Sequence, residues 1–470
     1  MSYDAVPSLV LRPPRGAHVA HLVLRVEPGQ GGEALRRLAG LLRDELPPSF
    51  GLDAPADDRL QCSVGFTWRG LQSLCVPAPY LRVFHRLSPA FAQGAPLRAA
   101  QLGDGAFNAP QYWDDGFRLD AAHILLTLHG MQPTLDEFVA SLTARWWPRP
   151  PKRVPAAVTC VAKICGARLG APAGQEGEWV HFGYRDGLSD RRIVGLPRPP
   201  EPVVSVEHAA GEFLLGHADD RAVNAYALPS APDKVRDFFR DGSFAALRPM
   251  RQDVAQFESA VQRWCEQARG EVDPRVGTDW IKAKLCGRWP TGQALVADRW
   301  EAGPDHGTID FTADPHGFAC PFASHIRRMN PRGEASDAHQ RQRPLLRRGT
   351  PFGSAVWNDP APDVARGLIG LFFCASLADQ FEHLLGQWAN RRPLGAPDTG
   401  QAQDAFAGVH EDPTVAMRLP RAGAAALELQ GFMPWTRTLG TMYAWHPSRS
   451  ALDRIVDQDW VPPESQGPWL

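Results

Sequence analysis

The sequence predicts an α+β fold made of two consecutive ferredoxin-like βαββαβ units. Apolar and β-branched runs alternate with segments of helical periodicity along the chain. In the first half these segments follow the order strand, helix, strand, strand, helix, strand, which is the order of a ferredoxin-like unit. The second half follows the same order with longer insertions but without a strong sequence repeat. A length of 470 residues allows two large domains.

The first unit is the clearer of the two. Four runs read as strands, namely residues 18–27, 60–66, 121–130 and 178–183. A helix is expected over residues 32–46, where leucines recur on one face, and a short helix after residue 66. Thr134 and Glu137 form a capping box, which predicts that a second long helix begins there. A long insertion separates the second strand from the third.

The second unit has fewer distinct signals. Strands are expected over residues 211–217, 242–247 and 367–376, and a helix over 251–268. A further amphipathic helix follows residue 376, and the Gly- and Ala-rich segment 395–408 is expected to be a loose loop. Two proline-rich stretches interrupt the chain, at residues 146–155 and 196–204. We expect the second stretch to separate domain 1–198 from domain 199–470, although a surface loop within one domain would also fit.

Bulk composition excludes several classes of protein. Hydrophobic residues make up 44% and charged residues 22%, as in ordinary globular proteins. Lys and Arg number 50 against 52 Asp and Glu, so no basic field argues for nucleic acid or a membrane surface. The eight cysteines form no C-x-x-C pair, which fits a reducing compartment. With no signal segment and no long apolar run, we expect a cytoplasmic protein.

The segment Gly183-Tyr184-Arg185-Asp186-Gly187 contains an aspartate that glycine follows directly. Glycine permits backbone conformations and close approaches that a Cβ atom prevents. Asp186 is therefore either an ordinary turn residue or a carboxylate held against a ligand.

His325 lies in the segment CPFASHIRRMNPRGE, close to Arg327, Arg328 and Arg332. A second basic segment, LLRRGTPFG, follows at residues 345–353. Taken singly, a histidine is more often structural and a basic cluster is more often solvated. Together, however, one His, one Asp flanked by glycine and several Arg are the groups that a haem peroxidase needs. Histidine ligates haem iron, and arginine pairs with haem propionates.

Ordered across nearly the whole chain, these motifs resemble the dye-decolourising (DyP-type) haem peroxidases. The G-Y-R-D-G segment matches the G-x-x-D-G motif of that family. The segments GSFAALRPMRQDVAQF, CPFASHIRRMNPR, LRRGTPFG and GTMYAWHPSRSAL are similar to four further family segments. The family motif usually continues S-Q-P, whereas here Ser189 is followed by Asp190 and Arg191, a departure that is expected to affect substrate access.

The resemblance implies two ferredoxin-like domains that form a dimeric α+β barrel-like fold, with one haem b per chain between them. It assigns His325 as the iron ligand, Asp186 as the distal acid–base group and Arg347 as the distal arginine. Arg347 and Arg327 are also expected to contact the haem. Arg348 and Arg332 are weaker candidates, either for a propionate contact or for a structural role. Asp379 and Glu382 are candidates to accept a hydrogen bond from His325, and the alternative for each is a solvated helix charge.

These roles predict a peroxidase that reduces hydrogen peroxide and oxidises an organic donor, dye-like or phenolic. An aspartate stays charged in mildly acidic solution, so an acidic optimum is expected. The alternative is a protein that binds or delivers haem with little turnover, and a third interpretation is a binding protein without haem. No nucleic-acid or membrane partner is expected, and the sequence leaves open whether the chain forms a homo-oligomer.

Overall fold

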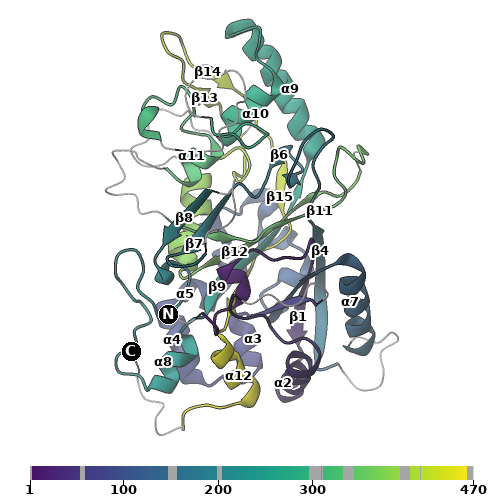
Figure 1. The fold of residues 1–470 in the computed structure, drawn as a ribbon, viewed down its shortest axis with the longest axis vertical. Helices are drawn as coiled ribbons and strands as arrows, with labels where there is room; N and C mark the ends of the chain where they lie inside the picture. Colours follow the sequence, from purple (N-terminus) through teal and green to yellow (C-terminus); the bar gives the residue numbers. More distant parts are fainter. Residues whose placement is uncertain are drawn as a thin grey trace.

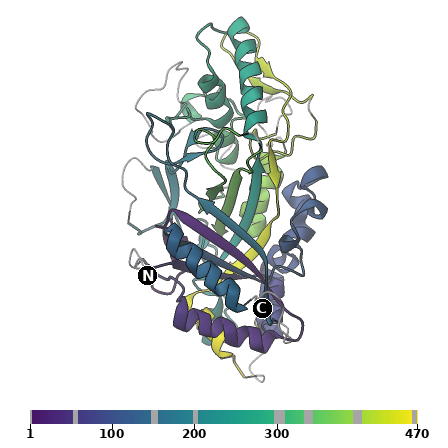
Figure 2. The same cartoon turned by 90° about the vertical axis from the view of Figure 1, so that its right-hand side faces the viewer.

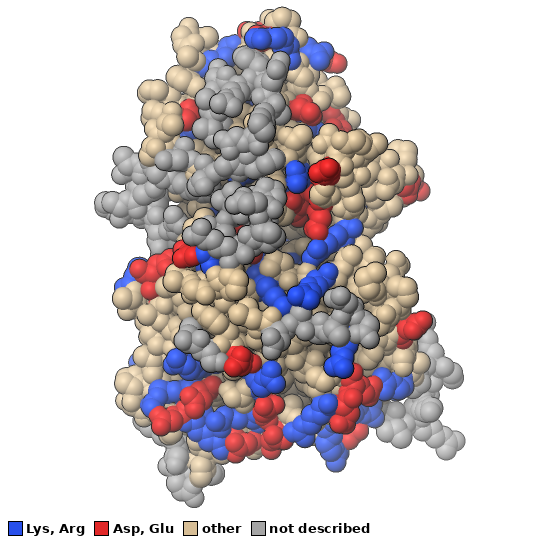
Figure 3. All heavy atoms as spheres, in the orientation of Figure 1, with Lys and Arg blue, Asp and Glu red and all other residues tan. Residues whose placement is uncertain are grey.

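A computed structural model describes most of the chain (Figure 1). The described residues are 3–52, 59–146, 156–197, 204–295, 309, 311–331, 343–361, 363–391, 403–412, 414–462 and 469. Among them, no helix is long and apolar enough to cross a membrane. Charges of both signs intermingle on the face shown in Figure 3, in keeping with the net charge of −2.

One ten-stranded antiparallel sheet runs through the molecule. Eight strands lie in the order β10-β12-β9-β16-β2-β3-β1-β4, while β11 pairs with β12 and β15 pairs with β9. The first-half strands are β1 (His18–Val26), β2 (Gln61–Phe66), β3 (Ile124–Gly130) and β4 (Val158–Ala167). The second-half strands are β9 (Ser243–Gln252), β10 (Leu346–Arg347), β11 (Thr350–Phe352), β12 (Gly367–Cys374), β15 (Thr436–Thr438) and β16 (Met442–His446).

Each half has the same strand arrangement. If the strands of each half are numbered along the chain, both halves read 2-3-1-4 across the sheet, with β10 and β11 together as the second strand of the later half. This is the antiparallel order of a ferredoxin-like unit. The two units meet where Trp445 of β16 pairs with Phe66 of β2. The predicted α+β class with two βαββαβ units is confirmed.

The two ends of the sheet approach each other. A Cβ atom added to Gly166 in β4 would lie 2.6 Å from the carbonyl oxygen of Pro351 in β11. Only glycine allows the backbones to come this close. The sheet therefore curls into a barrel-like shape, and β4 and the segment containing Arg347 lie near each other.

Helices cover the sheet and form a second layer beyond it. The helices of the first half are α1 (Ser8–Leu11), α2 (Gly31–Gly40), α3 (Trp68–Ser73), α4 (Ala78–Leu87), α5 (Pro89–Gln93), α6 (Ala99–Leu102) and α7 (Gln132–Trp146). Figure 2 shows α2 in purple and α7 in blue in front of the first-half strands. The later helices are α8 (Asp233–Phe239), α9 (Val254–Glu271), α10 (Thr278–Cys286), α11 (His325–Met329) and α12 (Arg449–Asp457), with π-helical turns at Leu41–Glu45, Leu377–Glu382 and Leu384–Ala389.

The buried apolar residues form two large clusters. The larger cluster lies between the sheet and its helices. The smaller one joins α9 and α10 to the hairpin β13 (Met417–Leu419) and β14 (Leu427–Leu429), at the top of Figure 1. It also contains Phe182, which precedes the G-x-x-D-G segment, and Tyr184, which lies within it. This segment is therefore anchored in the smaller cluster.

Several expected elements differ from the structure. The fourth strand of the first unit is β4, not residues 178–183, which instead contain β5 (Trp179–Val180) and lead into β6 (Tyr184–Arg185). β4 is an edge strand whose two faces differ little in burial, so its sequence lacks a clear alternation. Residues 211–217 are a 3₁₀ turn and loop that is apolar because Phe213, Leu214 and Leu215 pack in the core.

The helix α7 begins at Gln132, two residues before the expected capping threonine. Part of the predicted loop 395–408 lies outside the described residues, and its remainder, residues 403–408, contains a turn. The proposed boundary at residues 198 and 199 also lies outside the described residues, so the division into two domains stays a prediction. On either side of it, β7 (Ser189–Ile193) and β8 (Val204–His208) pair in parallel.

Candidate haem site

The loop with Asp186 is held on both sides by regular structure. β5 and β6 pair, and the Tyr184 hydroxyl donates to the Lys282 carbonyl at 2.9 Å. The Asp186 amide donates to the Glu178 carbonyl at 2.7 Å. Gly183 and Gly187 have φ angles of 77° and 72°, which side-chain-bearing residues rarely adopt. The Asp186 side chain is exposed, so the two glycines hold it at the surface of the loop.

The two adjacent arginines of LLRRGTPFG point to opposite sides, as strand geometry requires. Arg347 is exposed, whereas Arg348 is 3% exposed and its pKa is lowered by burial. Arg348 donates to the Leu9 carbonyl at 2.8 Å and contacts the Asp190 carboxylate at 3.2 Å. Arg348 therefore has a structural role, and so does Asp190, the charge that departs from the family motif.

Arg347 connects β10 to the Asp186 loop. Its Nη2 donates to the carbonyl and hydroxyl oxygens of Ser189 at 2.9 and 3.1 Å. Ser189 is three residues after Asp186. Across the ladder, Arg347 pairs with Phe372 of β12. The structure thus brings the segments of the two predicted distal residues together.

His325 is the first residue of α11, and the loop before it is fixed to α10. Lys284 of α10 donates from Nζ to the Phe318 and Ala319 carbonyls at 2.8 and 2.7 Å. The Ser324 hydroxyl donates to the Lys284 carbonyl. A loop held by three hydrogen bonds to one helix gives the imidazole a defined position.

The imidazole of His325 faces a buried carboxylate. Its Nδ1 lies 2.8 and 3.0 Å from the two oxygens of Asp404, which is fully buried. The Asp404 carboxylate also accepts the amides of Phe406 and Ala407 at 2.9 and 2.8 Å. Burial raises the pKa of Asp404, but the charge and hydrogen bond of His325 and the two amides lower it to about 2. Asp404 is therefore ionised and fixes the tautomer of His325.

Neither candidate partner of His325 contacts it. Asp379 is the solvated helix charge of the alternative interpretation: it is exposed, and its carboxylate accepts a hydrogen bond at 3.1 Å from the hydroxyl of Ser376, the N-cap of the same helix. Glu382 is buried but pairs with Arg98 and accepts from the Tyr443 hydroxyl at 3.0 Å. Asp404 was missed because it is 79 residues from His325 and lies in a Gly- and Ala-rich segment. The one local signal for Asp404 is that its carboxylate can accept the backbone amides of the residues two and three positions later, a pattern that is common in turns.

Phe406 joins the two parts of the site. Its ring lies 5.5 Å from the His325 ring and 5.6 Å from the Tyr184 ring, in edge-to-face geometry. Tyr184 is two residues before Asp186. The segments that carry His325, Asp186 and Arg347 therefore meet in one region.

The remaining basic residues are engaged elsewhere. Arg327 is buried, donates to the Cys320 carbonyl at 2.7 Å and contacts Asp314 at 3.1 Å. Its guanidinium carbon lies 4.0 and 4.6 Å from the Phe322 and Phe311 ring centres. These contacts support a structural role, so its expected haem contact stays a prediction that the geometry does not favour.

Arg328 is buried and donates to the Trp388 and Arg391 carbonyls, while Arg332 lies outside the described residues. His181, the second histidine of the region, is buried and contacts the Phe352 carbonyl through Nε2 at 2.8 Å. The Nε2 atom of His325, in contrast, has no hydrogen-bond partner among the described residues. An imidazole with one nitrogen on an ionised carboxylate and the other unengaged fits the axial ligand of haem.

Sequence comparison finds relatives of one kind. The chain is 29% identical to the multifunctional dye peroxidase DyP2 of Amycolatopsis sp. (strain ATCC 39116 / 75iv2) over 363 residues, which cover 72% of this chain and 69% of the relative. It is 27% identical to the dye-decolorizing peroxidase msp1 of Mycetinis scorodonius over 263 residues. That alignment covers 52% of this chain and spans about half, 48%, of the relative. No family model matches the chain.

Structure comparison gives the same fold over the whole chain. An ancestral D-type dye-decolorizing peroxidase superposes with a TM-score of 0.74 at 21% identity, covering 97% of this chain and 99% of that chain. A dye-decolorizing peroxidase in complex with 2,6-dimethoxyphenol superposes with a TM-score of 0.74 at 19% identity and the same coverage. These relatives and solved structures are of one kind, and the chain belongs to the dye-decolourising (DyP-type) peroxidase family.

Proposed function

We propose that the protein is a haem-dependent peroxidase that reduces hydrogen peroxide while it oxidises an organic donor. The observation that carries the proposal is the His325–Asp404 pair, which leaves the Nε2 atom of a fixed imidazole available for iron. His325 would hold one haem b per chain, and Arg347 would contact it from the sheet. Bound haem would supply the redox chemistry of the peroxide reaction.

Asp186 is the proposed acid–base group. Peroxide must lose a proton from one oxygen and gain a proton on the oxygen that leaves. A carboxylate that is ionised at the start can take the first proton and return it to the second oxygen. Gly183 and Gly187 support this role because their positive φ angles hold the side chain out of the loop.

Arg347 is the proposed charge stabiliser. A guanidinium keeps its proton throughout the working pH range, so it offers a permanent positive charge to the peroxide oxygens as negative charge develops. Its hydrogen bonds to Ser189 fix it beside the Asp186 loop before any substrate binds. Arg348 cannot substitute for it, because its guanidinium is buried against Leu9 and Asp190.

The donor is proposed to be dye-like or phenolic. The dye peroxidases that this chain resembles and the neighbour in complex with 2,6-dimethoxyphenol support that class. We also propose a reducing, cytoplasmic compartment, which is supported by eight cysteines that are all free.

The test is a spectrum followed by a turnover assay. Purified protein reconstituted with haem should show a Soret band and should consume one hydrogen peroxide for every two one-electron equivalents taken from 2,6-dimethoxyphenol. His325→Ala should lose most bound haem, whereas His181→Ala should retain it. Haem binding without peroxide consumption would instead identify a haem-handling protein, and full haem occupancy in His325→Ala would identify another ligand.

A further inference from the structure

The helix α10 holds the loop that carries Asp186. The carbonyl oxygen of Lys282 accepts a hydrogen bond from the Tyr184 hydroxyl at 2.9 Å. Tyr184 is 8% exposed and lies two residues before Asp186. Directly after Tyr184, the Arg185 amide donates to the Pro290 carbonyl at 2.8 Å, beyond the end of the helix. Two consecutive loop residues are therefore attached to α10 and to the segment that follows it.

The same helix holds the loop that carries His325. The carbonyl oxygen of Lys284 accepts a hydrogen bond from the hydroxyl of Ser324, which directly precedes His325. Lys282 and Lys284 are two residues apart, so their carbonyl oxygens differ in height by about 3 Å along the helix axis. One short helical segment thus carries an attachment for each side of the proposed haem site.

Lys282 contacts the Asp186 loop with its side chain as well. A Cβ atom added to Gly183 would lie 3.2 Å from the Lys282 ammonium nitrogen, so the loop backbone passes close to this charge. The ammonium group is held in place by Glu258 of α9 at 2.6 Å. Gly183 has a φ angle of 77°, so the chain turns at the point that the ammonium group faces. The loop therefore turns against a charge that two helices fix.

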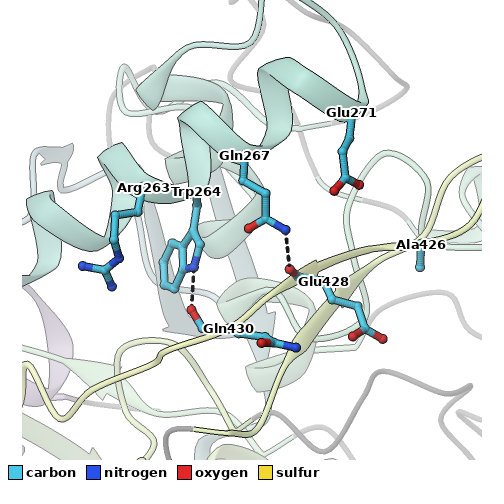
Figure 4. Close-up of a pocket in the computed structure, with 7 residues that line it drawn as sticks. All are labelled: Arg263, Trp264, Gln267, Glu271, Ala426, Glu428 and Gln430. Carbon is cyan, nitrogen blue, oxygen red and sulfur yellow. Dashed lines mark hydrogen bonds between the residues drawn. The ribbon is translucent and has the colours of Figure 1, made fainter.

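The helix that supplies Glu258 is anchored to the segment of β14 (Figure 4). Trp264 of α9 donates to the Gln430 carbonyl at 2.7 Å, and Gln267 of α9 donates to the Glu428 carbonyl at 3.1 Å. Trp264 is also buried in the smaller core cluster. The support behind the Asp186 loop is therefore continuous with a packed core.

We propose that Tyr184 is a positioning residue for the peroxide reaction and that its hydrogen bond to α10 sets where the Asp186 carboxylate lies. The proposal rests on the proposed function above and adds a residue that acts through Asp186. Among the described residues, none forms a hydrogen bond with the Asp186 carboxylate, which is exposed. Its position therefore depends on the backbone of its loop, and the Tyr184 side chain ties that backbone to α10.

The position of the carboxylate matters because proton transfer acts over a short range. A general base must come within hydrogen-bond distance of the proton that it takes, about 2.6–3.2 Å between heavy atoms or through one water molecule. A displacement of about 1 Å can slow a reaction by about 10²-fold even when the substituted residue is remote from the chemistry. Because α10 also holds the loop of His325, it sets the separation between the iron ligand and the acid–base group on a single support.

The first test measures hydrogen exchange in the haem-reconstituted protein by peptide mass spectrometry. The Asp186 amide donates to the Glu178 carbonyl at 2.7 Å, so its exchange reports opening of the loop. Tyr184→Phe should make this amide exchange at least tenfold faster. Tyr226→Phe is the matched control, because Tyr226 is 4% exposed and its hydroxyl bonds with Ser88 at 2.7 Å, but it lies in the larger core cluster. Unchanged exchange in Tyr184→Phe, or equal acceleration in Tyr226→Phe, would overturn the proposal.

The second test separates positioning from a general effect on the fold. Tyr184→Phe should slow the reaction of the holoenzyme with hydrogen peroxide by at least tenfold, but by less than twofold when Asp186 is already replaced by Asn. A hydroxyl that only stabilised the fold would slow both backgrounds by the same factor, and that result would contradict the proposal. The iron–imidazole stretching frequency should not change in Tyr184→Phe, because Ser324 holds the His325 loop separately.

The failure of this proposal and the failure of the proposed function give different results. If the parent consumes hydrogen peroxide with 2,6-dimethoxyphenol but Tyr184→Phe reacts as fast as the parent, the positioning role alone fails. If the parent consumes no hydrogen peroxide with any donor, the proposed function fails and the positioning role fails with it.

Discussion

The two sides of the proposed haem site are built in opposite ways. On the His325 side the groups behind the imidazole are paired within the chain: Nδ1 faces Asp404, and the Asp404 carboxylate is held by two backbone amides. On the other side, Asp186 is exposed and its loop is held through the backbone, while Arg347 is tied to Ser189. The first side offers one fixed nitrogen to a ligand, and the second presents exposed charged side chains.

This difference predicts which substitutions affect stability and which affect the peroxide reaction. Residues that form buried ion pairs and hydrogen bonds stabilise the chain, and their loss leaves buried groups without partners. Residues that the chain positions at an exposed site are available to act on a substrate. The pairs Asp186 with Asp190 and Arg347 with Arg348 test this rule, because Asp190 and Arg348 contact each other in a part-buried ion pair whereas Asp186 and Arg347 are exposed.

Asp186→Asn should have the largest kinetic effect. It keeps the shape of the side chain and removes the base, so haem should be retained while the reaction with peroxide slows by about 10²–10⁴. Stopped-flow absorbance would measure that rate, and the loss should be clearest in mildly acidic solution. Asp190→Asn is the control and should reduce stability with little change in rate. A parent-like rate for Asp186→Asn across the acidic range would exclude it as the proton carrier.

Arg347→Leu should slow the same step by about 10²–10³, which is typical for the loss of one preorganised charge. Arg348→Leu should change that rate little and lower the melting temperature instead, since Asp190 and the Leu9 carbonyl lose their partner. The rate and the melting temperature are measured on both variants. Equal rate losses in the two variants would mean that the strand register does not separate their roles.

Asp404→Asn should have a smaller effect of about 10- to 100-fold on haem affinity or turnover, as expected for a partner of a metal-bound histidine. The amide keeps the shape but not the charge, so the iron–imidazole stretching frequency in resonance Raman spectra should fall. Asp379→Asn is the matched control, because Asp379 is exposed and its carboxylate contacts the capping residue Ser376. A frequency shift in Asp379→Asn and none in Asp404→Asn would reverse the assignment.

The sequence predicted local features better than distant contacts. The strands β1, β2, β3, β9 and β12 follow directly from apolar periodicity, and the ordered motifs indicated Asp186, Arg347 and His325 before the structure placed their segments together. Asp404 could not be predicted, because its role depends on a contact between segments 79 residues apart. The roles of Arg327 and Arg348 could not be predicted from the sequence either, because each has an arginine as its neighbour and only the fold decides which of the two side chains is buried.

The central sheet is expected to respond to acid differently from the proposed haem site. Burial lowers the pKa of His21 and of His446 to about 3, and burial also lowers the pKa of His129 well below its usual value. His21 and His446 are 1% and 0% exposed, and their Nδ1 atoms contact Thr127 and Ser63 at 2.9 Å. The unfolded chain binds protons at these rings below about pH 6.5, whereas the folded chain does not until about pH 3.

The stability that these neutral histidines provide is therefore fully present above about pH 6.5 and is lost progressively as the pH falls towards 3. Within that window, each ring that is protonated in the unfolded chain but neutral in the folded chain lowers the free energy of unfolding by about 1.4 kcal/mol for every unit by which the pH falls. The Asp404 pair behaves differently: its carboxylate contributes stability above its ordinary pKa and loses it only as the pH falls through about 2. Acid should thus weaken the sheet before it neutralises Asp404.

Calorimetry between pH 7 and pH 4 tests this last effect, since a loss of about 3 kcal/mol for each ring corresponds to a fall of several degrees in melting temperature. His446→Gln should flatten the dependence of melting temperature on pH, even if it lowers the value at pH 7. The exposed His85 provides the control, because His85→Gln should leave the slope unchanged. If the melting temperature of the parent protein is constant between pH 6.5 and pH 4, the buried histidines take up protons in the folded chain as readily as in the unfolded chain. Any loss of activity in acid would then have to arise in the haem site.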